Sequence, residues 1–135
     1  MKRALGAILA GLGAAIVLIA GISFAAHSMY APAQPIDPND AKAVESFVST
    51  LPAGAFALIL AGWGIATFAG AWLAARLSRS AVYGFVIGAA VLIFAVAHML
   101  SAPHPYWVWS AGILIVVVTA FIAVRSALPA RESAG

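Results

Sequence analysis

The sequence predicts an all-α integral membrane protein, a four-helix bundle with a short amphipathic helix in its first extracytoplasmic loop. Hydrophobic residues make up 64% of the 135 residues, charged residues make up 8%, and the mean hydropathy is +1.07. A soluble domain is instead about 45–50% apolar and about 25% charged. Four stretches also reach the roughly 20 apolar residues that a spanning helix needs. We therefore expect a single transmembrane domain over residues 1–135, without a soluble domain.

The membrane spans are expected at about residues 4–26, 53–75, 81–101 and 106–124. Six basic residues flank the termini and the turn between the second and third spans: Lys2, Arg3, Arg76, Arg79, Arg125 and Arg131. The opposite side receives only Lys42. Short basic loops are retained in the cytoplasm, so this bias predicts that both termini are cytoplasmic.

The first span also has features of a secretory signal peptide. It has a basic start, an apolar core, and the small residues Ser23 and Ala25 before a possible cleavage point. Its apolar core is longer than the roughly 7–15 residues usual for such a segment. We therefore expect a retained first helix, and cleavage would leave three spans in the same orientation.

Small residues dominate the helix faces, which predicts close packing of helices within lipid. The second span carries small residues on nearly every side and is expected at the centre of the bundle. Two further stripes follow from helical periodicity. They are Gly84, Gly88, Val91, Ala95, His98 and Ala102 on the third span, and Gly13, Ile16, Ala20, Ser23 and His27 on the first.

Trp63 is expected near the middle of the membrane, away from the interfacial belt in which tryptophan is usual. Its indole N–H needs an acceptor. A carbonyl of a neighbouring helix would serve, which makes a packing role the simplest interpretation.

The loop between the first two spans carries the pattern of a short helix over about residues 38–50. Asp37 is expected to cap it, with Pro38 in its first turn. One face of this helix is apolar and formed by Val44, Phe47, Val48 and Leu51. Such a helix either lies in the membrane interface as a connector, which is the simpler interpretation, or covers the mouth of the bundle as a lid.

The three histidines are all expected at the side of this loop. Imidazole is the commonest neutral metal ligand and a proton acceptor near neutral pH. His27 and His98 come from different helices at similar depth and are a candidate haem-binding pair. Together with His104 and Glu45 they are also a candidate set of ligands for a divalent metal. The alternative is that the histidines are interfacial caps, whose polar tips reach water or a carbonyl.

Several classes of function are disfavoured by what the sequence lacks. There is no cysteine, so thiol redox chemistry and thiolate metal sites are excluded. A nucleic-acid partner would need a basic face in water, which this chain does not offer. An intramembrane hydrolase would have to combine Ser23 or Ser101 with His27 or His98, and no acid is placed to orient either imidazole. No catalytic residue is assigned, and an enzyme is the less favoured possibility.

The pieces "PIDPND", "LPAGAFALILAGWG", "AWLAARL" and "PHPYW" together resemble a family of small, uncharacterised bacterial inner-membrane proteins with four transmembrane helices. The resemblance covers roughly residues 27–125. It implies a multi-pass protein of the bacterial inner membrane and assigns no activity to any residue.

Three functions remain. The first is a non-enzymatic accessory or structural subunit that packs through its small-residue faces, against lipid, a second copy or a membrane-protein partner. The second is a haem-binding or metal-binding redox protein that uses the outer-face histidines. The third is a small transporter, which is least favoured because proton-coupled export depends on a buried carboxylate and none of the four acidic residues lies in a span.

Overall fold

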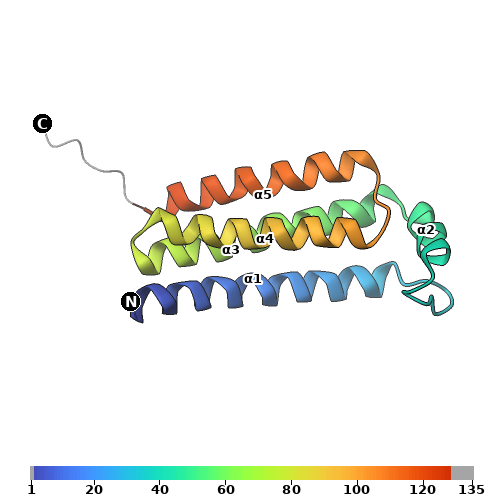
Figure 1. The fold of residues 1–135 in the computed structure, drawn as a ribbon, viewed down its shortest axis with the longest axis horizontal. Coiled ribbons are helices and arrows are strands. Elements are labelled where there is room, and N and C mark those ends of the chain that lie inside the picture. The colour runs from blue at the N-terminus through green and yellow to red at the C-terminus, as the bar shows by residue number, and fades with distance from the viewer. Residues whose placement is uncertain (1, 129–135) are drawn as a thin grey trace, which may run out of the picture.

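The computed structural model describes residues 2–128, in which four long helices lie side by side (Figure 1). They are α1 (Lys2–Met29), α3 (Ala53–Ser78), α4 (Ala81–Ser101) and α5 (Tyr106–Ala127). Each is long and apolar enough to cross a membrane. The described part of the chain contains helices and no strands, so the predicted all-α membrane bundle is confirmed.

Helix α3 is the centre of the bundle, as its small residues predict. It packs against α1, α4 and α5, while α1 lies on one side of the α3–α4 pair and α5 on the other (Figure 1). Ala66, Ala71 and Ala74 of α3 have no exposed surface. Because alanine and glycine let helix backbones approach closely, α3 can accept three neighbours at once.

Glycines mark the places where backbones touch. A Cβ atom on Gly11 of α1 would lie 2.7 Å from the carbonyl oxygen of Gly70 in α3, and the converse distance is also 2.7 Å. On α4, a Cβ atom on Gly84 would lie 2.9 Å from the carbonyl oxygen of Ala71. The predicted α4 stripe is confirmed as a packing face from Gly84 to Ala95, where its residues are buried. Its outer end is not part of that face, because His98 is exposed and Ala102 is half-buried.

The prediction of which face of α1 packs against the bundle was wrong. Helix α1 buries Ala7, Gly11 and Ala15, whereas Gly13 is exposed and a Cβ atom added to it would meet nothing within 4 Å. The contact between Gly11 and Gly70 explains the difference, because it fixes which face of α1 lies against α3. Of the remaining stripe residues, Ile16 and Ala20 line a small cavity between α1 and α4. Ser23 and His27 line a larger cavity at the α2 end of the bundle.

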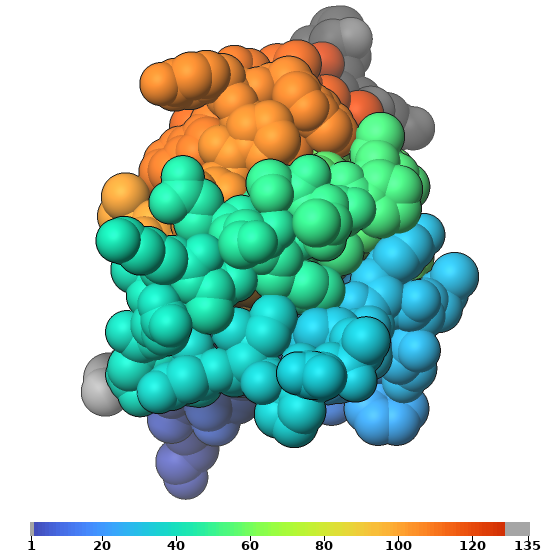
Figure 2. Space-filling view, turned by 90° about the vertical axis from the view of Figure 1, so that its right-hand side faces the viewer, coloured from blue at the N-terminus to red at the C-terminus, as the bar shows by residue number. Residues whose placement is uncertain are grey.

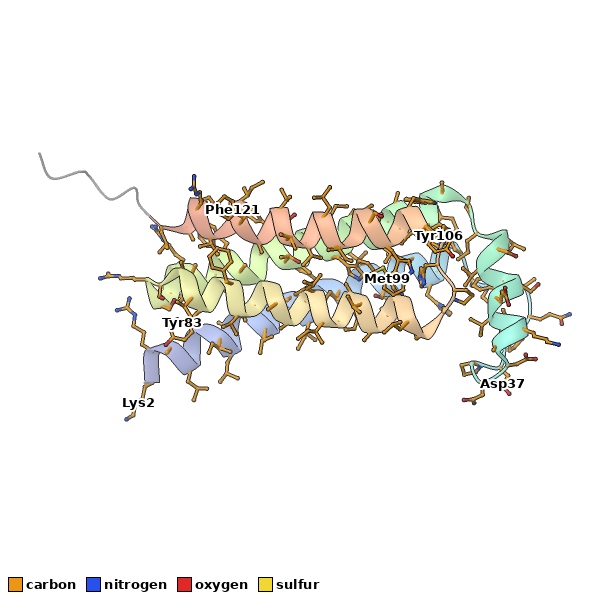
Figure 3. All side chains as sticks on the ribbon, turned by 45° about the horizontal axis from the view of Figure 1, so that its top comes forward. Lys2, Asp37, Tyr83, Met99, Tyr106 and Phe121 are labelled. Carbon is orange, nitrogen blue, oxygen red and sulfur yellow. The ribbon has the colours of Figure 1, made fainter. Side chains whose placement is uncertain are left out.

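The two ends of the bundle differ in chemistry. Lys2 and Asp37 lie at opposite ends (Figure 3). At the basic end, Arg3 Nε donates a 2.8 Å hydrogen bond to the Leu77 carbonyl, and Arg76 Nη1 donates one of 3.2 Å to the Ala127 carbonyl. These carbonyls belong to the final turns of α3 and α5, where cations also interact favourably with the helix dipole.

The short helix α2 (Ala41–Thr50) lies across the other end of the bundle (Figure 1). It begins later than predicted, and its cap is Asp40 instead of Asp37. Asp40 Oδ1 accepts hydrogen bonds from the backbone N–H groups of Lys42 and Ala43 at 3.1 and 3.2 Å. Asp37 Oδ1 instead accepts from the N–H of Asn39 at 2.9 Å, which holds the preceding residues in a turn.

Candidate functional site

A cavity of about 730 Å³ lies at the α2 end of the bundle. Its walls come from α1, through Ser23 and His27, from α3, through Trp63, and from α4, through Phe94 and His98. The loop before α2 and α2 itself complete the lining. This volume falls within the roughly 300–1,000 Å³ usual for small-molecule sites.

Helix α2 covers this cavity. Its apolar residues Val44 and Phe47, together with Leu51 just beyond it, line the cavity, and Val48 packs against the buried core. In the space-filling view, α2 and the loop before it spread over this end of the molecule (Figure 2). The backbone of α2 comes close to none of the four long helices within residues 2–128. Apart from its chain connections to α1 and α3, α2 is therefore attached to the bundle through side-chain contacts.

The polar groups of the cavity are hydroxyl, imidazole and indole groups. They are supplied by Ser23, His27, Tyr30, Trp63 and His98. Among residues 2–128, no lysine, arginine, aspartate or glutamate side chain lines it. The remaining lining is aliphatic, aromatic or proline, so the cavity is amphipathic and carries no fixed charge.

Trp63 is the most buried of these polar residues, with 3% of its surface exposed. Its ring meets the His98 ring edge-on, with centroids 5.7 Å apart. The expected carbonyl acceptor is not found, because the indole N–H donates no hydrogen bond to any described residue. In that same part of the chain, no fully buried side-chain nitrogen or oxygen lacks a partner. The indole N–H therefore keeps some exposed surface, and Trp63 lines the cavity.

The structure brings His98 and His104 together, with ring centroids 5.6 Å apart. His104 Nδ1 lies 2.7 Å from the carbonyl oxygen of Ala102. A carbonyl only accepts, so Nδ1 donates and carries the proton in this contact. The His104 ring also packs edge-on against Phe56, at 6.0 Å between centroids. His104 thus closes the α4–α5 turn beside His98, outside the cavity lining.

The predicted haem pair, His27 and His98, lines one cavity from two helices. Glu45 is exposed on α2 and does not line the cavity. Within residues 2–128, no three side chains among histidine, aspartate and glutamate are grouped so as to hold a metal ion. The haem pair and the four-residue metal set remain predictions.

A second, smaller cavity of about 300 Å³ lies between α1 and α4. Its lining is wholly apolar and includes Ile16 and Ala20 of α1 and Val91 of α4. Ile19 and Phe94 line both cavities, so the two meet at these side chains. Sequence reasoning raised a lid over the bundle mouth only as the alternative to an interfacial connector, and it did not identify either cavity. The α1 stripe that runs from Ile16 to His27 was the signal for both.

Comparisons with known proteins found no family model, curated protein or solved structure that matches this chain.

Proposed function

We propose that this chain is a non-enzymatic accessory protein of the bacterial inner membrane that binds an apolar or amphipathic molecule in the cavity beneath α2. Its four apolar helices make it a polytopic membrane protein. The single observation that carries the binding role is the cavity of about 730 Å³, lined by apolar side chains and a few polar ones. That combination is typical of small-molecule sites.

We further propose that the termini are cytoplasmic and that α2 faces the extracytoplasmic side. Of the basic residues that the structure describes, five lie at the end of the helices opposite α2: Lys2, Arg3, Arg76, Arg79 and Arg125. Lys42 on α2 stands alone at the other end. Positive charge is retained in the cytoplasm, which supports this orientation. The cavity then opens toward the outer leaflet.

Cysteine labelling tests this orientation directly, because the chain has no cysteine of its own. Ser49 on α2 and Ser126 at the end of α5 are both exposed serines. In intact cells, we expect a membrane-impermeant maleimide to label Ser49→Cys, and to label Ser126→Cys only after the inner membrane is permeabilised. The reverse pattern would place α2 in the cytoplasm and overturn the proposed orientation.

Tryptophan fluorescence tests whether apolar molecules enter the cavity. With Trp72, Trp107 and Trp109 replaced by phenylalanine, Trp63 becomes the only emitter. In bilayers of phospholipids with brominated chains, we expect Trp63 emission to be quenched although the ring is 97% buried from solvent. Quenching by bromine acts only over a short range, and the paired variants below distinguish an acyl chain in the cavity from lipid around the bundle.

A pair of alanine substitutions in this single-tryptophan background provides the control. Ala26 lines the cavity, whereas Ala97 is exposed and lines neither cavity. We expect Ala26→Phe to restore most of the Trp63 emission in brominated bilayers and Ala97→Phe to leave the quenching unchanged. Equal emission from all three proteins would mean that no chain reaches Trp63, and the binding role would fail.

A further inference from the structure

We infer that the cavity selects an uncharged amphiphile that combines a planar ring bearing carbonyl acceptors with a long apolar tail, the chemistry of the membrane quinones. The inference rests on the proposed function, and it names the class of ligand. Three features carry it: an unpartnered donor in an uncharged cavity, aromatic walls, and an apolar path that leads away between two helices.

The head group has to be neutral and has to accept a hydrogen bond. No charged side chain among residues 2–128 lines either cavity, and a charge buried without a partner is strongly unfavourable. The indole N–H of Trp63 only donates, and it has no acceptor among the described residues while its ring is 97% buried. A carbonyl oxygen on the ligand would satisfy this donor.

The walls around this donor suit a flat ring. The His98 ring lies edge-on to Trp63, with 5.7 Å between centroids, and nearly parallel to Phe94, at 6.2 Å and 23°. Tyr30 and Phe47 line the same cavity. Aromatic rings favour offset-stacked or edge-on neighbours over aliphatic ones of the same area. His98 lies between Trp63 and Phe94 and lines the cavity, so its imidazole is placed to contact the same head group.

The tail has a path from the cavity toward the lipid. The second cavity continues from the first at Ile19 and Phe94, and its lining is wholly apolar. Helix α1 lies against α3 far more extensively than against α4, so its seam with α4 is the looser one. Ile16 and Phe94 are 62% and 43% exposed along this seam. An apolar tail can therefore lie between α1 and α4 while the ring stays beneath α2.

Native mass spectrometry of the full-length protein released from mild detergent tests this inference. Three probes share a decyl tail: a decyl benzoquinone, decylbenzene and decyl phosphate. Because the tail is common to all, non-specific uptake is similar, and the head group decides the difference. We expect a 1:1 adduct with the quinone at about one tenth of the concentration that the other two need, or less.

Two variants locate the head group. Trp63→Phe keeps a ring and removes the N–H, and His98→Leu removes the polar partner beside it. Each should weaken quinone binding about threefold to tenfold and leave decylbenzene binding unchanged, whereas Ala97→Leu should change neither. Tighter binding of the phosphate, or an unchanged quinone preference in both variants, would overturn this assignment.

The outcomes separate this inference from the proposed function. If all three probes bind equally and Ala26→Phe abolishes their binding, the cavity is a binding site without the selectivity proposed for it. If no probe binds and brominated chains fail to quench Trp63, the binding role itself is wrong.

Discussion

Replacing Gly11 by leucine is expected to destabilise the bundle by about 1–3 kcal/mol, or more, whereas the same substitution at Gly13 should change stability by less than about 0.5 kcal/mol. The two glycines lie on one helix, two residues apart. A Cβ atom at Gly11 would lie 2.7 Å from the Gly70 carbonyl oxygen and 2.9 Å from the Ala74 Cβ atom, while at Gly13 it would meet nothing within 4 Å. The backbone of α3 cannot move aside as a flexible side chain would.

Equilibrium unfolding in mixed micelles, followed by circular dichroism, would measure both effects. Leucine also has the higher helix propensity, so a loss at Gly11 cannot be attributed to a weaker α1. If the two variants were equally stable, the close approach of α1 and α3 would be wrong, and with it the face of α1 that lines the cavities.

The spans and the centre of the bundle were predictable because they depend on composition alone. Four apolar stretches of sufficient length have few alternatives in lipid, where every backbone polar group must be paired within its own helix. The central position of α3 followed from small residues on all its sides, and the buried face of α4 followed from the spacing of Gly84 and Gly88. These features need no knowledge of which neighbour each helix meets.

The rotation of α1 was not predictable in the same way. The helix carries small residues on more than one face, including the two faces marked by Gly11 and Gly13. Which of them packs depends on the partner, and the partner residue, Gly70, lies 59 positions further along the chain. A single sequence does not reveal such pairings. The cavities were missed for the same reason, because they lie along the seam that this rotation leaves between α1 and α4.

The start of α2 was predicted incorrectly because two residues compete locally to cap it. Asp37 and Asp40 are both suitable N-caps, and Pro38 favours the first turn of a helix after Asp37. In the structure Asp37 forms a turn with Asn39, and Asp40 caps the helix. The shorter helix still presents Val44 and Phe47 to the cavity, so the amphipathic pattern located the apolar face of α2, although the cap was wrong and a connector was the simpler interpretation.

His98 and Trp63 show how far the site itself could be predicted. The small-residue stripe placed His98 toward the bundle, and the structure places it on the cavity wall. Trp63 was expected to donate to a carbonyl, a packing role that would leave no group free. Its unpaired N–H is visible only once the neighbours are known, and it is this group that changes Trp63 from a packing residue into a candidate ligand contact.

Trp63→Ala is expected to lower the free energy of unfolding by about 3 kcal/mol, the lower end of the range for removing a large buried aromatic side chain. The lower end applies because separated helices stay in an apolar solvent, so the loss comes from packing and not from transfer to water. The Trp63 ring packs directly on α5, where a Cβ atom on Gly112 would lie 2.9 Å from the Trp63 Cζ3 atom. By comparison, Trp107→Ala should have a smaller effect, because Trp107 is 47% exposed.

A substitution at Gly112 tests the same contact by adding a side chain where Trp63→Ala removes one. Gly112→Leu alone should be destabilising, because the added side chain meets the Trp63 ring and, at 3.4 Å, Leu60. In the Trp63→Ala background the leucine would enter the space that the ring has left. The double variant should therefore be more stable, by roughly 1 kcal/mol or more, than the sum of the two single losses in free energy of unfolding predicts. Strict additivity in the same mixed-micelle unfolding measurement would mean that Trp63 does not pack on α5, and that the wall between the cavity and this helix is placed incorrectly.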